Sequence, residues 1–195
     1  MGKFIEKNLS GWAQYPRSTG RIYRPEKLQS IVDILHDREE HSYIGRGMGR
    51  SYGDAALNEG GGLILTDRIR RFLSFNPSAG IVTCEAGMTL GGILQILVPQ
   101  GWFLPVTPGT KFVTIAGAVA CDVHGKNHHV DGSISNFVLG LDLLLADGQF
   151  LSCSREENTD LFWATLGGMG LTGVILAVTL SLRRIDSAFI QVDYQ

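Results

Sequence analysis

The histidines of this sequence are concentrated in one short polar run. Residues 121–129 read CDVHGKNHH and contain three of the five histidines. An imidazole can bind zinc or transfer a proton near neutral pH, so the run predicts either a metal site or a polar loop at the floor of an active site. In the second case we expect His124 and Lys126 to face a substrate or cofactor. A turn with a purely structural role is the third interpretation.

The glycines in and beside this run count against zinc. A helix would place His124 and His128 on one face, but Gly125 and Gly132 disfavour a helix there. The sequence has no second group of candidate ligands elsewhere. We therefore expect no metal site.

A glycine-rich loop is the second candidate for a binding site. Residues 45–54 read GRGMGRSYGD and follow a short expected strand, 42–44. Glycine frees successive main-chain N–H groups to point at a phosphate, and Arg46 and Arg50 are available to supply positive charge. The next segment, 50–59, is too short for the crossover helix of a Rossmann unit. The sequence therefore predicts an anion-binding loop, with an exposed hairpin loop as the alternative.

A third glycine motif matches a nucleotide-binding fingerprint in its letters but not in its context. Gly168, Gly170 and Gly173 have the G-x-G-x-x-G spacing. That fingerprint requires a strand before it and a helix after it, so that the helix N-terminus meets a pyrophosphate. Here a helix is expected before the motif and a strand after it. We therefore expect a glycine turn at the C-terminus of a helix, close to a ligand.

Strands and helices alternate along the chain that must position these loops. The expected strands are 20–24, 42–44, 62–66, 81–86, 139–146 and 174–182. The expected helices are 25–35, 89–97 with Thr89 as its N-cap, and 159–166. The turn-forming cluster Asn76–Gly80 is the best candidate for a boundary between two lobes. This order of elements predicts an α+β or α/β class.

The composition excludes several classes of protein. Glycine accounts for 25 of the 195 residues and 44% of residues are hydrophobic, so the chain is neither collagen-like nor disordered. The net charge of -2 lacks the basic excess of a nucleic-acid binder. The three cysteines, Cys84, Cys121 and Cys153, form no C-x-x-C pair, which favours a reducing compartment.

Two long uncharged stretches raise the question of a membrane span. Prolines interrupt residues 86–110 and glycines interrupt residues 161–182, so neither stretch is expected to form one continuous helix. Buried strands and tight turns explain both stretches better. Residues 1–12 lack the apolar core of a secretory signal. We expect a cytoplasmic or peripherally membrane-associated protein, without a signal peptide or a transmembrane helix.

Five blocks of this sequence occur in the same order in one protein family. They are Gly45–Asp54, Pro108–Thr110, Val113–Gly117, His124–His129 and Phe162–Gly168. Together they resemble the FAD-linked oxidases of the vanillyl-alcohol oxidase family, whose FAD-binding domain is of the PCMH type. The HGKNHH run is most similar to the decaprenylphosphoryl-ribose oxidase subfamily. The resemblance implies a two-lobed α+β FAD-binding domain over residues 1–195, with lobes at about 10–75 and about 80–185.

The resemblance also implies where FAD binds. The loop 45–55 would hold the pyrophosphate, Gly109 and residues 114–117 the flavin and ribityl side, and Gly173 with Ile175 the adenine end. The residues that the resemblance assigns to the cofactor are Arg46, Gly47, Met48, Gly49, Arg50, Ser51, Tyr52, Gly53, Asp54, Gly109, Thr114, Ile115, Ala116, Gly117, Cys121, Asp122, Val123, His124, Gly173 and Ile175. Relatives with covalently bound flavin often carry a histidine at the position of Arg50, so we expect non-covalent FAD.

The implied reaction is transfer of a hydride from a sugar carbinol to flavin N5, with the cofactor supplying the redox chemistry. His124 and Lys126 would lie beside the flavin as catalytic residues and reach toward the substrate. The implied substrate is a polyprenyl-phosphate-linked pentose, which suggests a place in cell-wall biosynthesis. A non-catalytic nucleotide-binding or scaffold module with the same fold is the alternative.

The enzymes of this family are more than twice as long as this chain, so we expect their substrate-covering cap domain to be absent here. An uncovered apolar face rarely stays bare in a soluble monomer. We therefore expect a homo-oligomer or a partner chain that carries a cap. The other expected partners are a lipid-linked sugar as substrate and a reductase for a keto product, and no nucleic acid.

Overall fold

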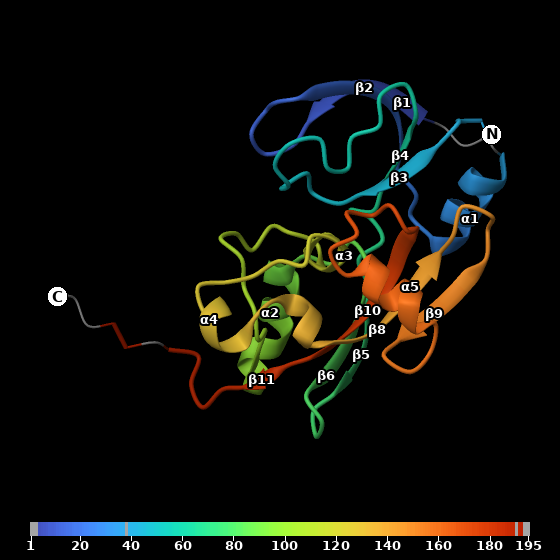
Figure 1. Ribbon diagram of the computed structural model, residues 1–195. Coiled ribbons are helices and arrows are strands. Elements are labelled where there is room, and N and C mark those ends of the chain that lie inside the picture. The colour runs from blue at the N-terminus through green and yellow to red at the C-terminus, as the bar shows by residue number, and fades with distance from the viewer. Residues whose placement is uncertain (1–3, 38, 190, 193–195) are drawn as a thin grey trace.

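The computed structural model describes residues 4–37, 39–189 and 191–192, and its strands form two main sheets with helices packed against them in an α+β arrangement (Figure 1). The first sheet has the order β1 (Phe4–Ser10), β2 (Arg17–Tyr23), β4 (Gly62–Leu65) and β3 (Tyr43–Arg46). β1 pairs antiparallel with β2, whereas β2 and β3 both run parallel to β4. The helix α1 (Leu28–Asp37) connects β2 to β3.

β10 (Val174–Ser181) lies at the centre of the second sheet. The order of this sheet is β5 (Phe72–Asn76), β6 (Ile81–Glu85), β10, β8 (Val138–Leu144) and β9 (Phe150–Ser154), and all neighbours are antiparallel. Consecutive residues of β10 are buried, so both faces of this strand are covered. The second half of the uncharged stretch 161–182 is therefore a buried strand, as predicted. Among the residues that the structure describes, no helix has the length and apolar composition needed to cross a bilayer.

The remaining elements are short. They are α2 (Leu90–Leu97), η1 (Val98–Gln100), β7 (Trp102–Phe103), α3 (Ile115–Ala120), α4 (His128–Asp131), η2 (Ile134–Asn136), α5 (Thr159–Thr165) and β11 (Arg183–Arg184). Thr89 caps α2 as predicted, because its hydroxyl accepts a hydrogen bond from Gly92 N at 3.1 Å. Thr114 caps α3 in the same way through Gly117 N. These caps satisfy main-chain donors where the two helices begin.

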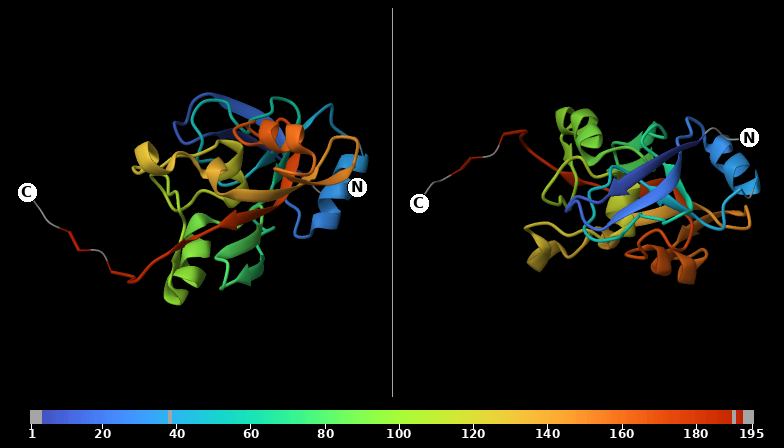
Figure 2. Two further views of the ribbon diagram at one scale, coloured as in Figure 1. Left: turned by 60° about the horizontal axis from the view of Figure 1, so that its bottom comes forward. Right: turned by 90° about the horizontal axis from the view of Figure 1, so that it is seen from above.

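Two apolar clusters hold the elements together. The larger cluster packs α2 and α3 against the second sheet. In the smaller one, Tyr23 and Ile64 of the first sheet and Ile31 of α1 pack with Val174 and Leu176 of β10. The two sheets therefore share a core through β10. Residues 186–189, which follow β11, extend away from both sheets (Figure 2).

Three features of the chain differ from the sequence-based expectations. The cluster 76–80, expected at a lobe boundary, is the turn between β5 and β6 of one sheet, where the Asn76 side chain accepts two main-chain hydrogen bonds. The chain passes between the sheets earlier, from Leu65 to Phe72. β1 is not predicted because its residues are mostly exposed and show no alternation. The run of small residues before Cys121 forms α3, which is also not predicted.

Candidate functional site

A cavity of about 610 Å³ lies between the first sheet and α3. Cavities that bind small molecules in proteins commonly have volumes of about 300 to 1,000 Å³. Residues from five parts of the chain line it: Trp12, the glycine loop 45–56, Thr66, the segment 108–124 and the turn 169–175. The loops of the first sheet face α3 from above in Figure 1.

Gly47 packs directly against the residue that caps α3. A Cβ atom at position 47 would overlap the hydroxyl of Thr114, and this hydroxyl accepts the hydrogen bond from Gly117 N. The φ angle of Gly47 is not positive, so the close approach and not the backbone conformation requires glycine here. The contact joins the glycine loop of the first sheet to the start of α3, and both border the cavity.

The guanidinium of Arg46 is bound to main-chain carbonyls. Nη1 donates to Ala56 O at 2.8 Å and Nη2 donates to Ser10 O at 2.6 Å. Burial lowers the pKa of this guanidinium. Gly49, with a φ of +62°, leaves room for it, because a Cβ there would lie 2.5 Å from Arg46 Nη2. Two N–H groups of Arg46 therefore fasten the loop, a role that the sequence does not predict. The expected contact of Arg46 with an anion stays a prediction.

Arg50 is the arginine of this loop that keeps donors near the cavity. Its Nη1 donates to Met48 O at 2.7 Å, and its Cζ lies 5.2 Å from the centre of the Trp12 ring. Its Nε is buried and has no hydrogen-bond partner among the described residues. Trp12 is not predicted as a site residue, because the sequence around it is a Gly-Trp pair in a polar stretch and contains no binding motif.

The wall opposite the glycine loop consists mostly of small side chains. The expected residues that line it are Gly109, Thr114, Ala116, Gly117, Cys121, Val123 and His124. Cys121 Sγ lies 3.5 Å from Ser51 Oγ. The two walls therefore meet at this pair as well as at Gly47.

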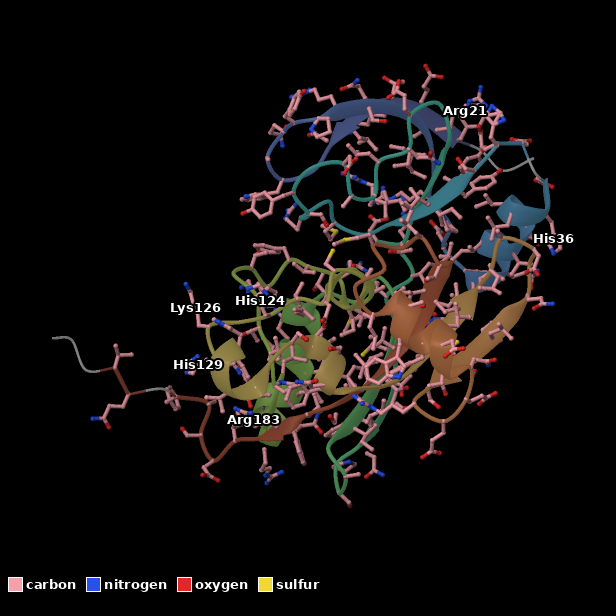
Figure 3. The ribbon with its side chains drawn as sticks, in the orientation of Figure 1. Arg21, His36, His124, Lys126, His129 and Arg183 are labelled. Carbon is pink, nitrogen blue, oxygen red and sulfur yellow. The ribbon has the colours of Figure 1, made fainter. Side chains whose placement is uncertain are left out.

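Five residues that were expected in the site lie outside the cavity lining. They are Gly53, Asp54, Ile115, Asp122 and Lys126. Ile115 is buried in the core, and the Asp122 carboxylate accepts hydrogen bonds from Ser133 Oγ and Ser135 N. Lys126 points outward from its loop (Figure 3). The other expected residues line the cavity, and their contacts with a cofactor stay predictions.

The histidine run forms a row of rings at the edge of the cavity. His124 lines the cavity, and the ring centres of His124 and His128 lie 5.5 Å apart. The ring of His129 follows at 5.8 Å from that of His128 (Figure 3). As predicted, His124 and His128 do not share a helix, because the short helix α4 begins only at His128 and its C-cap is Gly132, whose φ is +73°. Within the described part of the chain, no three His, Cys, Asp or Glu side chains are placed to hold a metal.

A carboxylate holds the end of this run. Asp131 accepts a hydrogen bond from Asn127 Nδ2 at 2.6 Å and forms an ion pair with Arg183 of β11. The Arg183 guanidinium, and after it the Asn127 amide, lower the pKa of the Asp131 carboxyl. Asn127 also donates to Pro105 O at 2.9 Å. The loop after His124 is therefore tied to β11 and to the segment that precedes the cavity wall.

The glycine turn 167–173 forms the third side of the cavity. α5 precedes it and β10 follows it, so the predicted order of helix, turn and strand is confirmed. Gly170 has a φ of +80°, and Met169 N donates to Ala120 O at 2.8 Å. This bond fixes the turn on α3. Residues 173–175 then line the cavity where β10 begins.

Comparison with known proteins links these features to flavin enzymes. The family described as FAD binding domain matches residues 20–154. Decaprenylphosphoryl-beta-D-ribose oxidase of Mycolicibacterium smegmatis is 37% identical over 191 residues, which cover 96% of this chain and 42% of that protein. Mitochondrial D-2-hydroxyglutarate dehydrogenase of Bos taurus is 31% identical over 183 residues, covering 87% of this chain and 33% of that protein.

L-gulonolactone oxidase of Mus musculus is a further similar protein. It is 31% identical over 177 residues, which cover 88% of this chain and 39% of that protein. The chain thus spans less than half the length of each of these three curated relatives.

Proposed function

Because this chain belongs to the FAD binding domain family of FAD-dependent oxidoreductases, we propose that it holds the FAD of an enzyme that oxidises a sugar alcohol. The contact between Gly47 and Thr114 carries the proposal, because it closes the glycine loop and α3 around one cavity. Main-chain N–H groups of such a loop bind phosphate. Ala116 and Val123 give the opposite wall the apolar surface that a flat ring requires.

The residues at the cavity fit a dinucleotide. Gly109 lines the cavity and has open space where a Cβ atom would point, so a ligand can approach its main chain. Arg50 Nε is a buried donor without a hydrogen-bond partner among the described residues. A pyrophosphate oxygen is the kind of acceptor that such a donor requires. We also propose that the FAD is held without a covalent link.

We propose that the histidine run accepts the proton of the substrate hydroxyl and binds the charged group of the substrate. FAD, when bound, accepts a hydride from a carbinol carbon. The imidazole of His124 lines the cavity, so it can accept the proton of the sugar hydroxyl. The ammonium of Lys126 extends outward from the same loop and can bind an anionic group of the substrate. Asn127 and Asp131 hold this loop in place.

The substrate that we propose is a polyprenyl-phosphate-linked pentose, with a role in cell-wall biosynthesis. The similarity to decaprenylphosphoryl-beta-D-ribose oxidase supports it, because this similarity extends over 96% of the chain. The lactone oxidase and the hydroxyglutarate dehydrogenase match less strongly, at 31% identity each. The keto product would pass to a reductase, and the enzyme would work in the cytoplasm or at the membrane surface.

We further propose that the two sheets form two lobes with the dinucleotide extended between them. A cap domain, a second copy of this chain or a partner chain would cover the cavity over the flavin. Met48, Tyr52 and Met169 support this proposal, because these large side chains line the cavity and are exposed.

Anaerobic reduction of bound FAD tests the proposed activity. Decaprenylphosphoryl-β-D-ribose should bleach the flavin absorbance of the full enzyme, while L-gulonolactone and D-2-hydroxyglutarate should bleach it far more slowly. Rapid bleaching by either of these two compounds would replace the proposed substrate class. FAD that stays oxidised with all three compounds would favour the non-catalytic nucleotide-binding module.

A further inference from the structure

Trp12 lies before residue 20, where the family match begins, yet it borders the cavity. It belongs to the loop between β1 and β2. The main-chain N–H of Trp12 donates to Ser51 O at 2.8 Å, and a Cβ at Gly11 would overlap the same oxygen. This close packing fixes the loop against residues 49–53 of the glycine loop.

The ring of Trp12 lies against the guanidinium of Arg50. The Cζ atom of Arg50 is 5.2 Å from the ring centre, and Nη1 donates to Met48 O. The ring contact and the hydrogen bond together restrict this long side chain before a ligand binds. Less conformational entropy of Arg50 is therefore lost on binding. Nε remains buried without a hydrogen-bond partner among the described residues.

We propose that Trp12 is a positioning residue of the FAD site, which holds Arg50 beside the glycine loop for the cofactor's diphosphate. This inference rests on the proposed function. The ring forms part of the cavity lining, and 56% of the residue is exposed, so a bound cofactor would cover part of it. The diphosphate carries the negative charge that the Arg50 guanidinium binds. Trp12 thus extends the site beyond the residues of the family match.

Trp163 offers a matched control within the same chain. Arg155 lies over its ring at 4.9 Å, and 47% of Trp163 is exposed, but it is not among the residues that line the cavity. The chain has three tryptophans, and the third, Trp102, also lies outside the lining. Removing Trp12 therefore breaks an arginine–tryptophan contact inside the site, and removing Trp163 breaks the same kind of contact outside it.

The experiment is a titration of FAD-free protein with FAD, followed by tryptophan fluorescence and by equilibrium dialysis. Trp12→Ala should raise the Kd for FAD by about three- to tenfold, as expected for loss of a partly desolvated cation–π contact. Trp163→Ala should change it by less than about twofold. Trp12→Phe should keep most of the affinity and lose most of the FAD-dependent quenching. This conservative variant also serves if Trp12→Ala does not fold.

A double-mutant cycle tests whether Trp12 acts through Arg50. In an Arg50→Ala background, Trp12→Ala should have little further effect on the Kd for FAD. Equal effects of Trp12→Ala and Trp163→Ala, or additive effects of Trp12→Ala and Arg50→Ala, would overturn the inference. Wild-type affinity in Trp12→Ala would overturn it too. Failure of the wild-type protein to bind FAD would instead overturn the proposed function.

Discussion

The main chain at Gly47 lies so close to the hydroxyl of Thr114 that a Cβ atom would overlap it. Gly47 belongs to the glycine loop after β3, and Thr114 is the N-cap of α3. The two residues come from different sides of the cavity, so their contact sets the distance between the loop and the helix. Any side chain at position 47 must displace the Thr114 side chain from its capping position or push these two walls apart.

Substitution of Gly47 should therefore weaken FAD binding more than it weakens the fold. Overpacking costs about 1–3 kcal/mol, so Gly47→Ala should raise the Kd for FAD by about five- to 150-fold. Gly47→Val should remove detectable binding with helix content intact. Gly140→Ala is the control, because a Cβ there meets Cys153 O at an ordinary 3.5 Å. Wild-type affinity of Gly47→Val, measured by calorimetry, would remove this loop from the site.

Gly49 and Gly53 separate two effects of a glycine substitution. Both have a positive φ, +62° and +64°. A Cβ at Gly49 would meet the Arg46 guanidinium at 2.5 Å, whereas a Cβ at Gly53 meets nothing within 4 Å. Both alanine variants should lose about 1 kcal/mol of unfolding free energy from backbone strain. Gly49→Ala should lose more in urea denaturation, because Arg46 must leave its carbonyl partners, and equal losses would contradict this explanation.

The ion pair between Asp131 and Arg183 predicts a pH dependence. The guanidinium lowers the pKa of the folded carboxyl below its unfolded value of about 3.9. The pair therefore stabilises the fold above that value, and this contribution is lost as the pH falls through the lower, folded pKa. Asp131→Asn should lower the unfolding free energy at pH 7 and match the wild type in stronger acid. Glu156→Gln, which removes a carboxylate that forms no ion pair within the described part of the chain, should show no such trend.

The FAD should come free when the protein is precipitated with acid. By the family resemblance, Arg50 occupies the position where flavinylated relatives often carry histidine, and a guanidinium is not the nucleophile that such a bond requires. Cys121 is the one free thiol among the described lining residues, at 3.5 Å from Ser51 Oγ. Flavin that remains in the pellet, or a peptide carrying the flavin mass at Cys121 or His124, would contradict non-covalent binding.

His124 and Lys126 should act on turnover and not on cofactor affinity. His124 lies at the cavity edge, and Lys126 points outward from it. His124→Ala and Lys126→Ala should therefore keep the Kd for FAD within about twofold of the wild type and lower the rate of flavin reduction. His124→Ala should lower this rate by about 100-fold, as expected for loss of a general base. Full activity of both variants in stopped-flow reduction would make them structural residues.

The sequence predicts local signals well and long-range contacts poorly. The cap at Thr89 and the order of α5, glycine turn and β10 can be predicted because each depends on neighbouring residues. The position of Trp12 cannot, since it depends on packing against Ser51, 39 positions later. The role of Arg46 is hidden for the same reason, because its acceptors are carbonyls of Ser10 and Ala56.

Short elements also escape prediction. β1 consists mostly of exposed residues without an alternating apolar pattern, and it exists because its main chain pairs with β2. α4 has four residues, fewer than a hydrophobic period can identify. The resemblance to a family points to the glycine loop and to residues 114–117, but the structure alone shows that they meet at Gly47.

Titration of the FAD-free protein with FAD tests the central claim most directly. The proposed site predicts saturable binding of one FAD per chain, with a shift of the flavin absorbance bands and competition by ADP for the diphosphate part of the cavity. Binding should be lost in Gly47→Val and kept in Gly140→Ala. A folded wild-type protein that binds no FAD, or that binds it equally well in Gly47→Val, would contradict the assignment of this cavity.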